Sequence, residues 1–70
     1  MAISVSYAPK LVRDHLVQVR DIRVRPDQVS NAQSVQVGPG QVRVVINTMS
    51  GLHEGIVDQY SGHVTNCRKI

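Results

Sequence analysis

The stretch VQVGPGQVRV, residues 35–44, decides the fold of this chain. At its centre, Pro39 has the fixed φ that suits the second residue of a type II turn, and Gly40 can adopt the positive φ of the third. On both sides of this turn valine alternates with other residues, as it does in half-buried strands. The stretch therefore predicts a β-hairpin. A loop longer than two residues stays open, because tight hairpins prefer type I′ or II′ turns.

The register of this hairpin follows from matching like residues across the two strands. With Gly38 opposite Gln41, the pattern predicts these apolar pairs on one face: Val37 with Val42, and Val35 with Val44. Val45 and Ile46 extend the second strand, so its apolar residues point to both faces. A strand that is apolar on both faces is typical of the centre of a sheet or of an interface.

The rest of the composition points to a small β-rich core that needs help from a partner. Thirteen of the 70 residues are valine, and Tyr7 and Tyr60 are the only aromatic residues. Valine favours extended backbone. A domain of this length rarely gains more than about 3–5 kcal/mol from its core. Cys67 is the only cysteine, so no disulfide within the chain can add to this. We therefore expect oligomerisation or a larger partner.

Two readings compete for the first 25 residues. Alternation over residues 3–7 predicts a strand that ends near Pro9. For residues 15–25, the alternating apolar residues favour a long strand with a β-bulge near Arg20-Asp21, which would keep both halves on one face. The alternative is a short helix before it, because Pro9 suits a first helical turn and Val12 and Leu16 are four residues apart.

Beyond Pro26, residues 27–33 are mostly polar and predict a loop. Ser50 can cap a helix over residues 51–62, in which Leu52, Ile56 and Tyr60 would form one stripe. The tail, residues 63–70, is read as a final short strand or an arm. The whole predicts one small domain over residues 1–70 of a mainly β class. It would hold a small antiparallel sheet, as a partly open barrel or a small sandwich, with at most one short C-terminal helix.

Catalysis and metal binding find little support in the sequence. His63 and Cys67 form one ligand pair, whereas structural zinc sites usually need two pairs. His53-Glu54 lacks the second histidine of a zinc-protease helix. A Cys67–His63 nucleophile would need a cleft, an orienting group and an oxyanion hole, and 70 residues leave little room for them. We expect a non-enzymatic protein with no metal site and no cofactor.

Membrane insertion and export are not expected either. No apolar run approaches the roughly 20 residues that span a bilayer. The first residues lack the basic and apolar regions of a signal peptide, so a cytoplasmic or virion location is expected.

The charge pattern suggests how the chain meets its partners. It carries eight Lys and Arg against five Asp and Glu, a formal net charge of +3, and six of the eight bases are arginine. Arginine and tyrosine are enriched at protein interfaces. We therefore expect a structural or assembly module, such as an accessory subunit of a virion or another symmetric assembly. Its expected protein contacts, to itself or to a partner, are Tyr7, Arg23, Arg25, Arg43 and Tyr60.

An alternative function rests on the same basic residues. Arginines on one strand face could grip phosphates, so the chain could be a small nucleic-acid-binding or regulatory protein. The residues that would carry this function are Arg20, Arg23, Arg25 and Arg43. Asp21 dilutes the patch, and a solvated strand face with ion pairs explains the same pattern.

Overall fold

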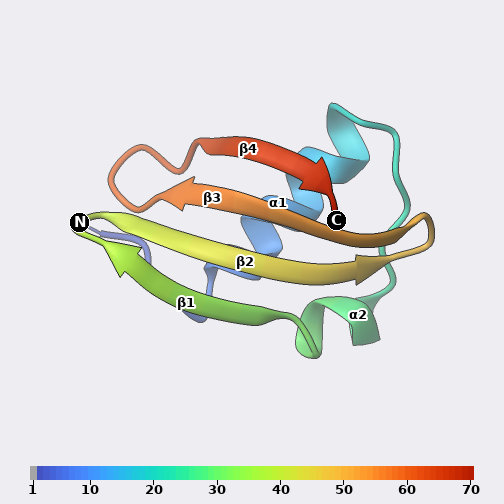
Figure 1. Cartoon of the computed structure of the whole chain (residues 1–70), viewed down its shortest axis with the longest axis horizontal. Helices are drawn as coiled ribbons and strands as arrows, with labels where there is room; N and C mark the ends of the chain where they lie inside the picture. The colour runs from blue at the N-terminus through green and yellow to red at the C-terminus, as the bar shows by residue number, and fades with distance from the viewer. Residues whose placement is uncertain (1) are drawn as a thin grey trace.

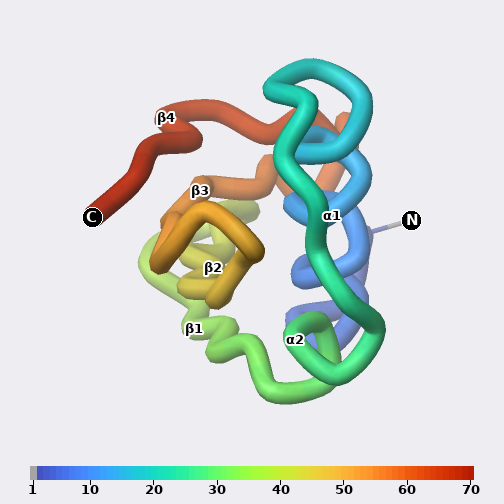
Figure 2. The backbone as a smooth tube through the Cα atoms, turned by 90° about the vertical axis from the view of Figure 1, so that its right-hand side faces the viewer, coloured from blue at the N-terminus to red at the C-terminus, as the bar shows by residue number. Residues whose placement is uncertain are grey.

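A four-stranded antiparallel sheet in the order β1-β2-β3-β4 forms one layer of the protein, and two helices form the other (Figure 1). The computed structural model describes residues 2–70. The helices are α1 (Ala8–Gln18) and α2 (Pro26–Ser30), and the strands are β1 (Gln33–Gly38), β2 (Gln41–Thr48), β3 (Gly51–Asp58) and β4 (Val64–Lys69). Seen along the sheet, both helices lie on the same side, so the opposite face of the sheet is uncovered (Figure 2).

The predicted small antiparallel sheet of a mainly β class is confirmed, and it is not closed into a barrel. The helices, however, precede the strands, and the predicted C-terminal helix over residues 51–62 is wrong. That segment is β3 followed by a turn. The four-residue spacing of Leu52 and Ile56 satisfies a strand as well as a helix, since both are even-numbered and share one strand face. The tail forms β4, in line with the first of the two readings given for it.

In the first 25 residues, the helical alternative holds and the strand predictions are wrong. Residues 3–7 form no strand, and α1 covers Ala8–Gln18 with Pro9 in its first turn. Residues 20–25 are a connection without regular structure, and the predicted strand and bulge over residues 15–25 are absent. The helix wins because Ala8, Val12 and Leu16 recur at four-residue intervals, and all three are fully buried against the sheet. Residues predicted as a loop over 27–33 begin instead with most of α2.

The β1–β2 hairpin is confirmed, with Pro39 and Gly40 at its turn and Gly38 opposite Gln41. Its predicted register is wrong from Val37 onward. A bulge at this residue shifts the pairing by one, so the observed pairs are Gln36 with Val42, Val35 with Arg43, and Ser34 with Val44. A one-residue shift moves a strand's side chains to the other face. Val35 therefore lies on the uncovered face and is 58% exposed.

The core lies between α1 and the central strands. Its seven fully buried apolar residues are Ala8, Val12, Leu16, Val42, Val44, Ile46 and Val57. As predicted, β2 lies inside the sheet, and its alternate residues from Val42 to Thr48 face the helices. On β3, Gly55 lies opposite Val44, and a Cβ built there would be 3.5 Å from Val12 of α1 and 3.2 Å from Val64 of β4. Gly55 thus allows α1 to lie close to the sheet.

The turn at Gly40 gives a direct test of the hairpin geometry. Gly40 has φ +70°, and a Cβ there would be 3.0 Å from Cδ2 of the Tyr60 ring and closer still to Cε2. We expect Gly40→Ala to destabilise the fold by about 1–2 kcal/mol, the cost of a left-handed conformation for an L-residue. At Gly38 a Cβ would meet only the Gln41 side chain at 3.7 Å, so Gly38→Ala is the matched control. Urea unfolding of both variants measures the difference, and equal midpoints would contradict the prediction.

Candidate interaction surface

The side of the sheet that faces away from the helices is called here the outer face (Figure 2). Its residues alternate with those that face the core, as strand geometry requires. From β1 to β4 they include Gln33, Val35, Arg43, Val45, Asn47, Leu52, Glu54, Ile56, Thr65 and Arg68. Val35 and Leu52 are exposed, while Val45 and Ile56 are half-buried by their neighbours. Ile70 adds a further exposed apolar side chain beside this face, and its backbone N–H donates to Leu52 O at 2.9 Å.

An ionic cluster occupies the middle of the outer face. Glu54 of β3 lies between Arg43 of β2 and Arg68 of β4. Arg43 Nε and Nη2 donate to Glu54 Oε2 at 2.8 and 2.6 Å, and Arg68 Nε donates to Oε1 at 2.7 Å. The carboxylate side chain is only 11% exposed, whereas the two arginines are 46% and 71% exposed. The cluster therefore carries a net charge of +1 and presents it to solvent through two guanidinium groups.

Beside this cluster the outer face is hollowed. The hollow is lined by Arg43, Glu54, Ile56, Asn66, Cys67 and Arg68, so it combines two cationic groups with the apolar side chain of Ile56. Burial raises the pKa of the Cys67 thiol, which keeps that group protonated and uncharged. The hollow can receive an acidic side chain next to an apolar one.

The pKa values of two carboxyl groups in β3 predict how the stability of the fold changes with pH. Hydrogen bonds from Arg68 and then Arg43 lower the pKa of Glu54 below its ordinary value of 4.5. The Ser61 and Tyr60 N–H groups lower the pKa of Asp58 below 3.8. A carboxyl whose pKa is lower in the folded state stabilises the fold above its ordinary pKa. That stabilisation is lost as the pH falls through the folded-state pKa.

We therefore expect the urea midpoint to fall progressively below about pH 4.5, the ordinary pKa of Glu54. In Glu54→Gln, part of this acid sensitivity should disappear. The effect should shrink in high salt, since Arg43 and Arg68 are accessible to solvent. A Glu54→Gln protein with the acid sensitivity of the natural sequence would contradict the role assigned to this cluster.

The residues predicted as contacts do not form one patch. Arg43 is on the outer face, whereas Arg23 lies in the connection between α1 and α2, and Arg25 is the N-cap of α2. Tyr7 is the N-cap of α1, and Tyr60 lies in the β3–β4 turn, where it is 75% exposed. All five are exposed. Their roles as contacts stay predictions, but only Arg43 belongs to the outer face.

The arginines of the nucleic-acid alternative are also separated. Arg20, Arg23 and Arg25 were expected on a strand beside Arg43, and that strand does not exist. They lie in the connection that leads from the end of α1 to α2 (Figure 1). Arg20 Nη1 donates to Cys67 O at 2.9 Å, which ties this connection to β4.

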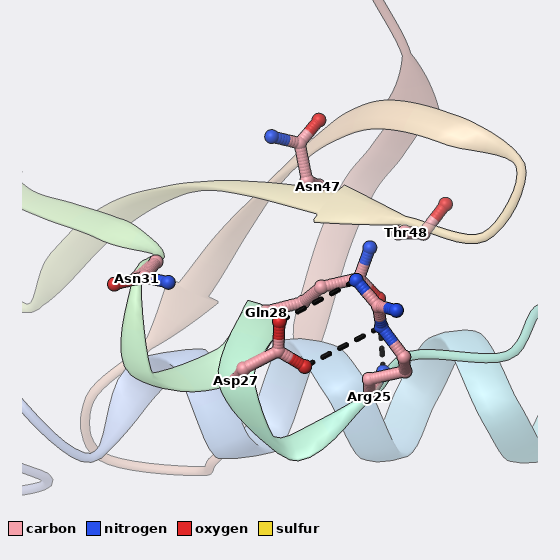
Figure 3. A pocket seen from close by; sticks show the side chains of 6 residues that line it. All are labelled: Arg25, Asp27, Gln28, Asn31, Asn47 and Thr48. Carbon is pink, nitrogen blue, oxygen red and sulfur yellow. Dashed lines mark hydrogen bonds and ion pairs between the residues drawn. The ribbon is translucent and has the colours of Figure 1, made fainter.

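A polar hollow near the start of α2 is the other place where functional groups gather (Figure 3). It encloses about 240 Å³ and is lined by Arg25, Asp27, Gln28, Asn31, Asn47 and Thr48. Arg25 is already engaged there, since its guanidinium lies 3.4 Å from Asp27 and its backbone N–H donates to Gln28 Oε1 at 2.9 Å. Asn47 points away on the opposite side of β2 (Figure 3). These contacts hold the start of α2 together.

The histidines and the cysteine do not converge. His53 is buried near the start of β3, where its Nδ1 is 3.1 Å from Gly51 O. His63 precedes β4 at the other end of β3, where its C=O accepts from the Asp58 N–H at 2.9 Å. The strand from His53 to Asp58 spans about 17 Å at about 3.3 Å per residue. No group of three or more potential metal ligands occurs within residues 2–70. His63 stands just before β4, and Cys67 lies four residues further along, about 13 Å away in extended backbone, which is too far for a nucleophile–base pair.

Sequence reasoning found Arg43 but not the other members of the outer face. Leu52, Glu54 and Ile56 alternate in a way that fits one strand face, and this signal was hidden by the helical spacing assigned to the same segment. Arg68 could be placed only once β4 was known to pair with β3.

Comparison with known proteins adds no family to this description. No protein-family model, curated protein or solved structure matches the chain. Among the described residues, no helix is both long and apolar enough to cross a bilayer.

Proposed function

We propose that this protein is a non-enzymatic assembly module that binds another protein through its outer face. An accessory subunit of a virion or of another symmetric assembly is the specific form of this role that we favour. The module would contribute a rigid sheet surface rather than chemistry. The observation that carries the proposal is the open layer of the fold, since one face of the sheet is covered by helices and the other faces solvent.

The composition of the outer face supports a protein partner. Val35 and Leu52 are exposed on it, and Val45 and Ile56 are half-buried. Exposed apolar side chains gathered on one face mark interaction sites, and here they flank the central ionic cluster. Removing this apolar surface from water on binding is favourable by about 25 cal/mol per Å² of surface buried.

Charge on this face narrows the chemistry of the partner. Arg43 and Arg68 leave a net charge of +1 after Glu54 is counted, and they line a hollow that also contains Ile56. A partner surface with apolar side chains and at least one carboxylate complements this arrangement, because charge complementarity raises the association rate and orients the complex. A second copy stacked face to face would oppose arginine to arginine.

The proposal is tested by site-specific photo-crosslinking in the native host cells. A photoreactive amino acid is placed at Leu52 or Ile56 on the outer face, and at Lys10, an exposed position of α1, as the matched control. We expect a discrete protein adduct from the two outer-face positions and none from position 10. Arg43→Glu combined with Arg68→Glu should abolish this adduct, and peptide mapping should place the cross-link beside acidic residues.

The same experiment separates the alternative functions. Adducts of equal yield at all three positions would contradict the proposed face. An adduct that nuclease removes, and that weakens steeply as salt rises, would instead support nucleic-acid binding. Binding to an apolar protein surface should respond far less to salt.

A further inference from the structure

The two edges of the sheet differ in how far they are protected against pairing with another strand. β1 and β4 are the edge strands. In an antiparallel strand, every second residue points both its N–H and its C=O away from the neighbouring strand. Edge strands in natural proteins are usually guarded by charges, proline, bulges or a covering segment.

The edge at β4 is guarded in three ways. A bulge interrupts its pairing with β3, and Asn66 there has φ +51°. Arg68 and Lys69 place two positive charges on the strand. Arg20 reaches from the connection after α1 and donates to the Cys67 carbonyl at 2.9 Å. A strand added at this edge would meet a distorted, charged and partly occupied backbone.

The edge at β1 has far less protection. Its sequence, QSVQVG, contains no charged residue and no proline. Apart from β2, no strand within residues 2–70 pairs with it. The bulge at Val37 and the Gln36 Nε2 donation to Gly38 O, at 2.7 Å, modify only its last residues. The regular part of this edge, Gln33 to Gln36, is uncharged. It pairs with residues 42–45 of β2 and leaves its other side unpaired.

We infer that β1 pairs antiparallel with β1 of a second copy of this chain, joining two sheets into one of eight strands. The two-fold axis would run perpendicular to the sheet, midway between the two β1 strands, so that Val35 lies opposite Val35 of the second copy. Ser34 then lies opposite the second copy's Gln36. This register keeps outer-face residues beside outer-face residues, whereas a one-residue slip would place Val35 beside the polar inner-face positions.

A second copy fits this edge better than an unrelated strand for two reasons. The pairs that the register creates are uncharged, and those nearest the axis match Val35 with Val35 and Ser34 with Gln36, which is favourable across strands. No charge on β1 selects a partner of opposite charge. The contact is short, so we expect it to bury less than the roughly 1,200 Å² at which stable interfaces begin and to give a weak dimer.

This inference concerns the edge of the sheet and does not rest on the outer face binding a partner. It adds to the proposed function, because the two outer faces of the dimer would form one continuous surface. The outer-face proposal and the edge-pairing inference can fail independently, because different experiments test them. Crosslinking in cells reports on the outer face, and self-association of the purified chain reports on the edge.

The test uses charge reversal at the symmetry axis. Sedimentation equilibrium of the purified chain, up to about 1 mM, should reveal a monomer–dimer equilibrium. Val35→Lys and Val35→Glu each place like charges opposite each other and should weaken the dimer roughly tenfold. An equimolar mixture of the two variants should restore association, because lysine then faces glutamate. Leu52→Lys makes the same change on the outer face at β3 and is the matched control, with dimerisation unchanged.

Several results would overturn the inference. A natural chain that stays monomeric at the highest concentration would contradict it. So would a Leu52→Lys protein that loses association as completely as Val35→Lys, because this would indicate stacking of outer faces. A mixture of Val35→Lys and Val35→Glu that remains monomeric would show that Val35 is away from the axis. Circular dichroism of each variant must match that of the natural chain, since Val35 is exposed and its replacement should leave the fold intact.

Discussion

Leu16→Ala is expected to leave most of the protein unfolded at room temperature. Leu16 is fully buried between α1 and the sheet and is among the largest residues of the core. Truncating a buried leucine to alanine costs about 2–5 kcal/mol. A core of this size rarely supplies more than about 3–5 kcal/mol in total. The far-ultraviolet circular dichroism spectrum and its thermal transition measure the loss.

Leu52→Ala is the control for that experiment. It makes the same chemical change on the outer face, where Leu52 is 39% exposed and lies on the side of the sheet opposite to the core. We expect a much smaller loss of stability, since less apolar area is removed from contact. If both variants unfolded to the same extent, the division between a buried inner face and an open outer face would be wrong.

The second large effect is expected at Gly55, where strand propensity and packing predict opposite results. Valine is favoured over glycine in strands, so propensity alone predicts that Gly55→Val stabilises β3. The structure predicts the reverse. Even the Cβ would lie 3.2 Å from Val64 Cγ1 and 3.5 Å from Val12 Cγ2, and the two additional methyl groups of valine would have to displace α1 or β4. Overpacking of this kind costs about 1–3 kcal/mol, a large part of the total.

Chemical denaturation of Gly55→Val measures this cost, and a higher urea midpoint than that of the natural chain would contradict it. A compensating variant shows whether packing is the cause. Val64→Ala removes the methyl group nearest to the new Cβ. The Gly55→Ala protein should therefore lose less stability in the Val64→Ala background than alone, a coupling that independent sites do not show.

The parts of the fold that the sequence predicted are those set by local chemistry. The hairpin turn depends on Pro39 and Gly40 alone, and it is present. The register depends on the bulge at Val37, and the residue type at this position does not predict a bulge. For α1, the helical stripe of Val12 and Leu16 competed with the alternation of Val17 and Val19. Packing decided the outcome, since the first pair is buried and the second is exposed.

The candidate surface was harder to predict than the fold. Arg43 was singled out because the β2 alternation was recognised, and it does lie on the outer face. Glu54 and Arg68 were missed because they meet Arg43 only through the pairing of β2 with β3 and of β3 with β4. The arginines at 20, 23 and 25 were grouped by an alternation that fits a strand, yet their segment is an irregular connection. The charge pattern therefore identified Arg43 as a candidate but not Glu54 and Arg68, which lie beside it in the folded protein.

Strand order in this protein repeats the order of the chain, from β1 to β4. Each strand pairs with the one that follows it, across connections as short as two residues. Native contacts between residues near each other in sequence close at little entropic cost, and domains rich in them fold quickly. The docking of the N-terminal part, α1 included, brings distant parts of the sequence together, as in the donation from the Ile3 N–H to Gln59 O at 2.8 Å. We therefore expect the strands to pair first and the helix to pack on them late.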